Sequence, residues 1–301
     1  MTTQYIPSVN FHGEDVPQSA PDRALFHVIP VPYEKSVSYG TGTAEGPQAI
    51  LDASCQLELF DGKGIPAECG IHTQPMLDCR GSHEEALARV ETAVTACLSH
   101  EKIPVVLGGE HTITYGAIRA LRQKYPDFGV VQFDAHADLR ETYEGSPFSH
   151  ACVMKRVFDM GIPLLQLATR SYSLEEHTLR QGQGIAYIDA QAIFQMDIDD
   201  FVLPADFPEK IYISFDVDGL DPSIMPATGT PVPGGLTWYQ AMGLLQRIMD
   251  SRICIGLDVV ELAPVPLLHS ASFTAAQLVY AMMGFLCRSH KNRKYWGRIG
   301  I

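Results

Sequence analysis

The sequence predicts an α/β protein: a three-layer α/β/α arrangement around a mostly parallel central sheet. Short apolar, β-branched runs alternate along the chain with longer segments whose apolar residues recur at helical spacing. Most strand candidates are near-continuous apolar runs, such as Pro104-Val-Val-Leu, and such runs are typical of strands covered on both faces by helices. No repeat or composition break interrupts the 301 residues, so we expect one domain over residues 1–301.

The expected elements follow in chain order. Six strands are expected at Leu25–Val31, Ile103–Leu107, Gly129–Phe133, Leu164–Ala168, Lys210–Phe215 and Ile253–Val259. Five helices are expected at Gly46–Phe60, Glu84–Leu98, Thr112–Tyr125, Tyr239–Asp250 and Phe273–Cys287. Ser82 provides an N-cap for the second helix. The loops Ser38–Pro47 and Met225–Gly235 are rich in glycine or proline and are expected to adopt unusual backbone shapes.

Composition and charge exclude several classes of protein. The chain is 46% hydrophobic and 19% charged, which is enough apolar material for a sizeable core. Lys and Arg number 22 against 35 Asp and Glu, and the net charge of −13 argues against nucleic acid or an anionic membrane as a partner. The same acidity leaves room for cationic ligands and metal ions.

Cysteine usage and hydropathy indicate the compartment. Seven scattered cysteines without a C-x-x-C pair are typical of reduced thiols in a cytosolic protein. The first residues lack the apolar core of a signal peptide, and the longest apolar stretch, near Leu278–Cys287, is about half a membrane span. We therefore expect a cytoplasmic protein without a membrane partner.

Acidic residues and a histidine follow two of the expected strands. Asp134-Ala-His136-Ala-Asp138 follows the third strand, and if the chain stays extended the three polar side chains point to one side. Asp216-Val-Asp218 follows the fifth strand in the same way. Carboxylates gathered on one face repel one another unless a cation lies between them. Both segments are therefore candidates for a metal site.

A third segment, Gly108-Gly-Glu-His111, follows the second strand, and its glycines permit a sharp turn close to a site. Ligand sites in open parallel sheets lie at the carboxyl ends of the strands, where these segments begin. Two imidazoles and four carboxylates exceed what one zinc needs, but they suit two hard or borderline divalent ions, such as Mn²⁺, that share carboxylates. The candidate metal ligands are His111, Asp134, His136, Asp138, Asp216 and Asp218.

Five ordered motifs resemble the signature segments of the ureohydrolases, the arginase/agmatinase family of binuclear manganese enzymes. The motifs are Gly108–His111, Phe133–Asp138, Ser214–Pro222, Ala227–Gly235 and Asp258–Pro264, and the resemblance runs from about Pro30 to Leu286. It implies two Mn²⁺ per chain bridged by Asp134 and Asp216. His111 and Asp138 would complete one metal site, and His136 and Asp218 the other.

The resemblance also implies catalytic and substrate-binding residues. Glu261, after a fourth strand, would bind the guanidinium of the substrate, because a carboxylate matches a planar cationic fork. His150 matches the position that relays protons to the leaving amine, a task that suits an imidazole, and it would also contact the substrate. Asp138 would help to move a proton. The implied reaction releases urea and an amine.

The substrate is inferred from two loops. The segment after Asp138 lacks the asparagine that reads the α-carboxylate in arginases, and Val31–Pro47 is more similar to the agmatinase branch. The implied reaction converts agmatine to putrescine and urea, a step of polyamine biosynthesis. Pro264–His269 departs from the agmatinase pattern. Aminopropylagmatine, guanidinobutyrate, arginine and guanidine therefore stay open as alternative substrates.

Other functional hypotheses are weaker. Gly40–Gly46 is spaced G-x-G-x-x-x-G, one residue longer than the dinucleotide fingerprint, and no Walker lysine is present, which argues against a nucleotide-binding oxidoreductase. A non-catalytic ureohydrolase-like binding protein is opposed by the presence of all six candidate ligands. The basic segment Arg288–Arg298 is expected to be solvated or to form a subunit contact. The resemblance implies a homo-oligomer, a trimer or a hexamer.

Overall fold

A parallel β-sheet forms the centre of the protein, for which the computed structural model describes residues 10–297. Within these residues the sheet has eight strands in the order β2-β1-β3-β8-β7-β4-β5-β6, and every neighbouring pair is parallel. The strands are β1 (Phe26–Val31), β2 (Ile71–Thr73), β3 (Ile103–Gly108), β4 (Gly129–Phe133), β5 (Leu164–Leu167), β6 (Ala186–Ile188), β7 (Lys210–Asp216) and β8 (Ile253–Val260).

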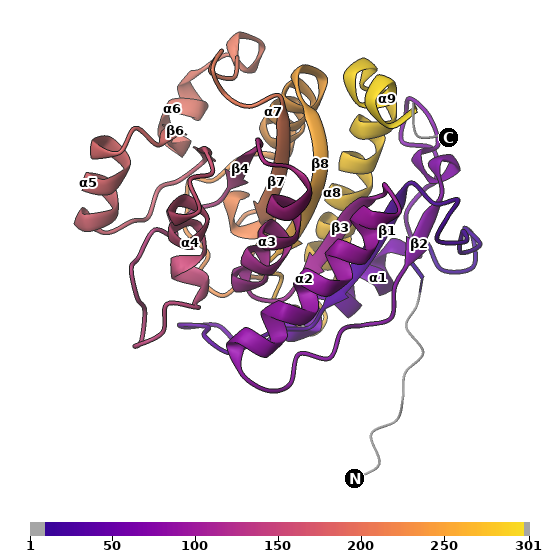
Figure 1. Ribbon diagram of the computed structural model, residues 1–301, viewed down its shortest axis with the longest axis horizontal. Helices are drawn as coiled ribbons and strands as arrows, with labels where there is room; N and C mark the ends of the chain where they lie inside the picture. Colours follow the sequence, from indigo (N-terminus) through magenta and orange to yellow (C-terminus); the bar gives the residue numbers. More distant parts are fainter. Residues whose placement is uncertain (1–9, 298–301) are drawn as a thin grey trace.

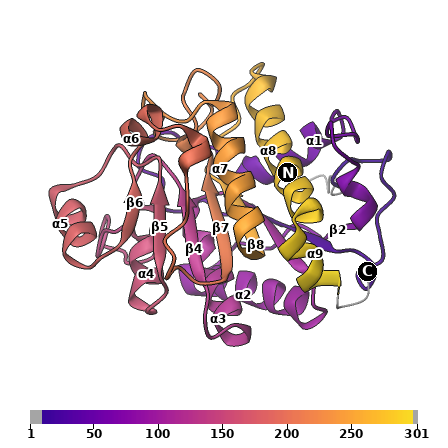
Figure 2. The same cartoon turned by 90° about the horizontal axis from the view of Figure 1, so that it is seen from above.

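Helices cover both faces of this sheet and make three layers (Figures 1 and 2). One face carries α2 (His83–Ser99), α3 (Thr114–Lys124) and α4 (Val153–Asp159), and the other carries α1 (Gly46–Ser54), α7 (Trp238–Ser251) and α8 (His269–Arg288). Three shorter helices are α5 (Leu174–Gly182), α6 (Ala190–Gln195) and α9 (His290–Trp296). The predicted three-layer α/β/α fold with a parallel sheet is therefore confirmed.

The helix ends show why the sequence folds this way locally. Ser82 caps α2 as expected: its hydroxyl accepts from the backbone N–H of Glu85, and the Glu85 carboxylate accepts from the backbone N–H of Ser82. The same reciprocal pair begins α5 at Ser173 and α7 at Thr237. These caps satisfy donors that a helix leaves unpaired at its first turn.

Several elements differ from the sequence prediction, and the short helices α4, α5, α6 and α9 were not expected. The strands β2 and β6 were not expected, because three residues at a sheet edge are too few to carry a hydrophobic pattern. The first helix ends at Ser54 rather than Phe60, and α8 begins at His269 rather than Phe273. Helix ends are the least determined part of a pattern, and these differences leave the order of the strands unaffected.

The C-terminal helices belong to the core. By length and composition α8 could cross a membrane, but 61% of its most apolar window is buried, and Leu278 and Val279 lie inside the hydrophobic core. In α9, Asn292 and Trp296 are buried, and the Asn292 side chain accepts from the Cys254 backbone N–H at 2.8 Å. The expectation of a solvated final stretch holds for the exposed Lys291, Arg293 and Lys294 but not for Asn292 and Trp296, whose amide and indole groups pair with β8. The alternative, a subunit contact, stays a prediction.

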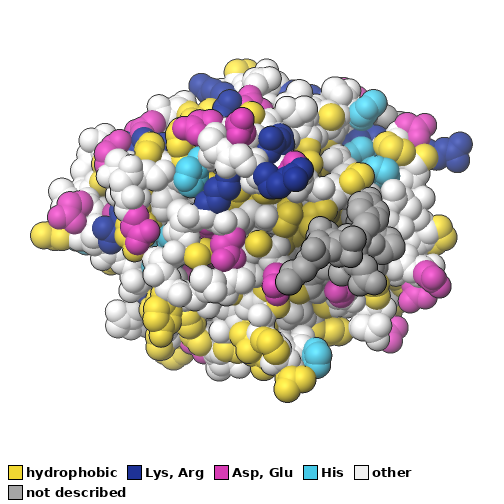
Figure 3. Space-filling view, turned by 90° about the horizontal axis from the view of Figure 1, so that it is seen from below, with side chains coloured by type: hydrophobic (Ala, Val, Ile, Leu, Met, Phe, Trp, Pro, Cys, Tyr) yellow, Lys and Arg dark blue, Asp and Glu magenta, His cyan; other side chains and the backbone are white. Residues whose placement is uncertain are grey.

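On the face drawn in Figure 3, the net negative charge does not gather into one continuous acidic patch. On the side of the molecule seen in Figure 3, acidic side chains are interspersed with lysines, arginines and apolar groups. Part of the excess acidity lies inside the protein, since Asp134, Asp138, Asp216, Asp218 and Asp258 are all buried. Buried carboxylates in such number need partners, and four of them converge at one place.

Candidate metal centre

The polar residues predicted for the site follow four adjacent strands at the middle of the sheet. In sheet order β3, β8, β7 and β4, the chain continues into His111 after β3, Glu261 after β8 and Asp134 after β4, whereas Asp216 is the last residue of β7. Because all four strands are parallel, their carboxyl ends share one edge of the sheet. This shared edge is where the side chains meet.

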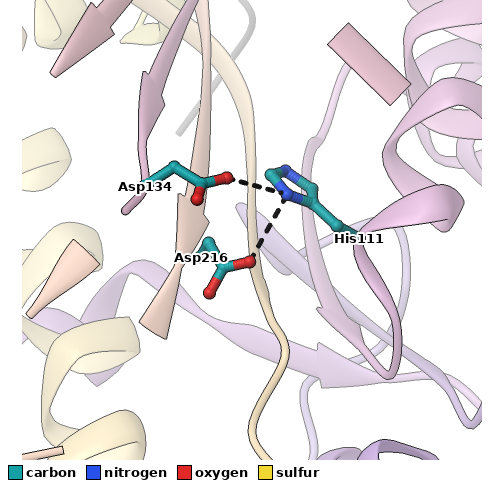
Figure 4. Close-up of side chains that lie close together, drawn as sticks. All are labelled: His111, Asp134 and Asp216. Atoms are coloured by element: carbon teal, nitrogen blue, oxygen red, sulfur yellow. Dashed lines mark ion pairs between the residues drawn. The ribbon is translucent and has the colours of Figure 1, made fainter. Parts of the chain in front are cut away.

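One group of side chains surrounds His111. Its Nδ1 lies 3.1 Å from Asp134 Oδ2, 3.0 Å from Asp138 Oδ2 and 3.5 Å from Asp216 Oδ2. Figure 4 shows the imidazole and the carboxylates of Asp134 and Asp216 turned toward one another. All four side chains are buried. One nitrogen and three carboxylate oxygens therefore face the same small volume.

A second group adjoins the first and shares Asp134. His136 Nδ1 lies 3.0 Å from Asp218 Oδ2 and 3.6 Å from Asp134 Oδ1. Asp134 thus directs one oxygen to each histidine. Either group could hold a metal ion, with His111, Asp134 and Asp216 in one and Asp134, His136 and Asp218 in the other. The structure therefore brings all six sequence-predicted ligands together.

The turns that produce this convergence are not the extended ones expected from the sequence. Asp138 has φ of 53° and Glu261 has φ of 64°, both in the left-handed region that side chains other than glycine rarely adopt. Asp218 lies in a 3₁₀ turn, and its backbone N–H donates to Asp216 Oδ1 at 2.9 Å. Such strained conformations persist when surrounding contacts enforce them, and they concentrate at functional sites.

The hydrogen bonds of His111 test whether a metal fits this site. Its Nε2 lies 2.8 Å from Ser214 Oγ, which itself donates to Asp258 Oδ1 at 2.8 Å. Because the serine proton is given to the carboxylate, Nε2 carries a hydrogen. Burial alone would lower the pKa of His111, but the three carboxylates raise it well above its usual value, so Nδ1 offers its lone pair to a cation once it gives up the second proton. That buried Nδ1 has no hydrogen-bond partner among the described residues. A lone pair facing three carboxylates is the donor set of a divalent cation.

The charges of the cluster lead to the same conclusion. Burial, followed by the charge of Asp134, raises the pKa of Asp138 to about 7. Burial, followed by the charge of Asp218, raises the pKa of Asp216 well above its usual range. Burial alone would lower the pKa of His136, but hydrogen bonds to Asp134 and Asp218 raise it to about 12. Without a cation, these carboxylates can lie close together only because Asp138, Asp216 and His136 retain protons. A divalent cation would replace those protons.

Glu261 and His150 border the cluster. Glu261 Oε1 accepts from the backbone N–H of His111 at 2.6 Å, and its pKa is raised well above its usual range by burial and then by Glu110. His150 is half-buried, its Nδ1 lies 3.4 Å from Ser36 Oγ, and burial lowers its pKa. Both side chains line the cavity that opens over the cluster.

Two adjoining cavities give access to the cluster. The inner one has a volume of about 20 Å³ and is lined by His136, Asp138, Asp216, Asp218, Glu261 and His150 together with the loops 37–40 and 228–230. The outer one, of about 240 Å³, shares Ser38, His136, Asp138, His150 and Thr230 with it and extends to Arg140, Tyr143, Tyr172 and Glu176. A narrow slot at the cluster therefore opens into a wider chamber.

Several supporting residues were not identified from the sequence. Ser214 and Asp258 fix His111, Gln132 donates to Asp134 Oδ2 at 2.7 Å, and Arg170 binds the carbonyl oxygen of Asp218 at 2.7 Å. Ser214, Asp258 and Gln132 share one signal, a polar residue inside an otherwise apolar strand. Such residues in a buried strand require a partner, and here that partner is the cluster or its ligands.

Comparison with known proteins places these observations in context. Residues 24–284 match the Arginase family. The chain is 38% identical to N(1)-aminopropylagmatine ureohydrolase of Thermus thermophilus, covering 91% of this chain and 93% of that protein. It is 36% identical to the protein of the same name from Synechocystis, covering 88% and 90% of the two chains.

Two further relatives carry a related name. The chain is 34% identical to agmatinase of Pyrococcus horikoshii, covering 88% of this chain and 93% of that protein. Among solved structures, the agmatine ureohydrolase of Thermoplasma volcanium superposes with a TM-score of 0.85 at 30% identity, covering 98% and 97% of the two chains. These matches extend over nearly all of the chain, including the four strands that carry the cluster.

Proposed function

The chain belongs to the Arginase family, a family of binuclear metal enzymes, and we propose that it hydrolyses a guanidino derivative of a polyamine with two Mn²⁺ per chain. The observation that carries this proposal is the buried cluster in which Asp134 lies between His111 and His136. Oxygen-rich ligands with two imidazoles suit Mn²⁺, and a carboxylate between two histidines suits a shared ligand. Asp134 and Asp216 are the proposed bridging ligands.

The remaining ligands divide between the two positions. We propose His111 and Asp138 for one ion and His136 and Asp218 for the other, in agreement with their distances from the two imidazoles. Divalent cations held there would act as Lewis acids and would lower the pKa of water, which a bound zinc ion brings to about 7. Ser214 holds one of these ligands, His111, in the tautomer that leaves Nδ1 available to an ion.

The proposed reaction is balanced by one water molecule. The bond between the guanidinium carbon and the substituted nitrogen breaks, the water oxygen ends in urea, and both water protons end on the released amine. Glu261 is placed to bind the guanidinium, because its buried carboxylate is fixed by the His111 N–H and lines the inner cavity. Asp138 would accept a proton from water, and His150 would deliver one to the amine.

The outer cavity favours a substrate longer than agmatine. Its volume of about 240 Å³ adjoins the slot, so a tail that follows the guanidinium has room there. The rings of Tyr143 and Tyr172 and the carboxylate of Glu176 line this cavity and would favour an ammonium group. The Glu176 oxygens also accept from the Leu139 and Ser173 N–H groups, and Arg180 lies over the Tyr172 ring. Arg140 lies in the same wall and opposes a cation, but its guanidinium sits 5.6 Å from the Tyr143 ring centre. We therefore favour N(1)-aminopropylagmatine, with agmatine as the second candidate because relatives of both names match.

Urea release from a panel of guanidines tests this proposal. With Mn²⁺ present, kcat/KM is expected to be highest for N(1)-aminopropylagmatine, about tenfold lower for agmatine, and lower still for guanidinobutyrate, arginine and guanidine. Agmatine as the best substrate would shift the choice to the second candidate. A preference for guanidinobutyrate would show that Arg140 governs the outer cavity, and it would contradict a polyamine substrate. No urea from any guanidine would refute the enzyme class.

The setting of the enzyme follows from the same proposal. Hydrolysis of N(1)-aminopropylagmatine or agmatine yields a polyamine, spermidine or putrescine, so a role in polyamine biosynthesis is proposed. We also propose a cytoplasmic location and a homo-oligomer, a trimer or a hexamer. Light scattering of the purified chain tests the last point, since a monomer at micromolar concentration would contradict it.

A further inference from the structure

A buried carboxylate beside the cluster has no role in the scheme above. Glu110 precedes His111 and its side chain is fully buried. One carboxylate oxygen accepts from the backbone N–H groups of Lys35 at 2.5 Å and Ser36 at 2.7 Å. The other accepts from the hydroxyls of Ser36 and Thr112. Four hydrogen bonds satisfy this charge, and three of them come from the loop after β1.

Ser36 connects Glu110 to His150. Its Oγ lies 3.4 Å from His150 Nδ1 and 3.3 Å from the backbone nitrogen of His150, which donates to it. The single proton of the Ser36 hydroxyl is directed to Glu110. Ser36 Oγ therefore only accepts from His150, because a hydroxyl has one hydrogen to give.

We infer that Glu110 and Ser36 are positioning residues that keep the hydrogen of neutral His150 on Nδ1 and leave the lone pair on Nε2. Since Ser36 Oγ can only accept, it forms a hydrogen bond with the tautomer that carries hydrogen on Nδ1 and none with the tautomer that has a lone pair there. This inference rests on the proposed function for the role of His150, which lines both cavities. The proton delivered to the amine then passes through Nε2.

A second serine provides an internal comparison. Ser149 Oγ also lies 3.4 Å from His150 Nδ1, but no carboxylate accepts its proton among the described residues. Ser149 could donate to Nδ1 and favour the opposite tautomer. The two hydroxyls therefore lie at the same distance from Nδ1. Ser149 is able to donate its proton to Nδ1, whereas Ser36 gives its proton to the buried Glu110. Because Glu110 takes the Ser36 proton, a hydrogen on Nδ1 has two hydroxyl oxygens to donate to, whereas a lone pair on Nδ1 has only Ser149 as a donor.

Neutron diffraction from deuterated crystals at about pD 8 tests the tautomer directly. The expected result is a deuteron on His150 Nδ1 directed to Ser36 Oγ, a deuteron on Ser36 Oγ directed to Glu110, and none on Nε2. A bare Nδ1 that accepts the deuteron of Ser149 would overturn the inference. This readout does not depend on turnover, so it remains valid if the proposed function fails.

Steady-state kinetics test the consequence for catalysis. Ser36→Ala is expected to lower kcat about tenfold with KM nearly unchanged, whereas Ser149→Ala lowers kcat less than about threefold. In the His150→Ala background, Ser36→Ala should cause no further loss, because its effect passes through His150. Equal losses in the two serine variants, or a full additional loss without His150, would show that Ser36 only supports the loop.

A Glu110→Gln variant separates charge from shape. The amide keeps the size of the side chain, but it turns a donor toward either the backbone N–H groups or the Ser36 hydroxyl. The expected result is a loss of kcat similar to that of Ser36→Ala, with the metal content unchanged. A variant that keeps wild-type kcat while folding normally would contradict the role of Glu110. If wild-type protein releases no urea, only the proposed function fails, and the diffraction result decides the inference.

Discussion

Removal of the Ser214 hydroxyl tests how the metal ligand His111 is held. In the folded protein Ser214 Oγ lies between His111 Nε2 and Asp258 Oδ1, at 2.8 Å from each. The substitution Ser214→Ala removes this link and leaves the two flanking groups buried. His111 then loses the acceptor that keeps its hydrogen on Nε2, so the lone pair on Nδ1 is no longer assured.

The expected magnitude follows from these two bonds. Partners of this kind, one step removed from the metal, typically change metal affinity by about 10- to 100-fold, or about 1.4 to 2.7 kcal/mol. The two unsatisfied buried groups also lower the free energy of unfolding by about 1–3 kcal/mol. We therefore expect Ser214→Ala to need 10- to 100-fold more Mn²⁺, approximately, for half-maximal urea release. Saturating Mn²⁺ should restore most of the rate.

Thr114→Val is the matched control. Thr114 Oγ1 donates to Asp258 Oδ2 at 2.8 Å, where Tyr212 also donates. Its hydroxyl makes no hydrogen bond to the His111 imidazole among the described residues, and the backbone N–H of Thr114, which donates to the His111 carbonyl oxygen, is kept in the variant. This variant should lose about 1 kcal/mol of stability and keep the Mn²⁺ dependence of the wild type. The reasoning is refuted if Ser214→Ala and Thr114→Val destabilise the fold alike and neither changes the Mn²⁺ dependence.

Three further predictions concern other parts of the chain. Gly109→Ala places a Cβ 2.1 Å from the Tyr33 carbonyl oxygen and should cost about 1–3 kcal/mol in a thermal melt, whereas Gly182→Ala, in open space, should change stability by less than about 0.5 kcal/mol. Burial lowers the pKa of His12 to about 4, so the free energy of unfolding should be unaffected by His12 above about pH 6.5 and should fall as the pH drops toward 4. His12→Asn should reduce this pH-dependent loss, measured by urea unfolding, by up to about 3 kcal/mol. Glu261→Gln should raise KM at least about tenfold without changing bound metal, measured by urea release and metal analysis.

Much of the fold followed from the sequence because its signals are long. The buried strands are apolar runs of five to eight residues at β3, β4, β7 and β8, and each ends in a polar segment. Parallel strands place such segments at one edge, so the neighbourhood of His111, Asp134 and Asp216 could be predicted from the sequence alone. The sheet order, with β8 between β3 and β7, depends on long-range packing that no local pattern encodes.

The detailed shape of the site could not be predicted. The sequence argument placed Asp134 and Asp138 on one side of an extended chain, but Asp138 turns into a left-handed conformation. Its position is set by neighbours distant in sequence, such as Glu176, whose carboxylate accepts the Leu139 N–H at 3.0 Å. The link from Glu110 through Ser36 to His150 joins three separate loops. Such contacts become visible only when the loops are brought together.

Metal titration of the stripped chain tests the central claim most directly. The protein is freed of metal by chelation, Mn²⁺ is added in known equivalents, and urea release from N(1)-aminopropylagmatine and from agmatine is measured at each step. We predict no turnover in the stripped chain and a rate that rises to a plateau at two equivalents per chain. Full turnover in the stripped chain, or a plateau at one equivalent, would contradict a centre built on two ions that share Asp134.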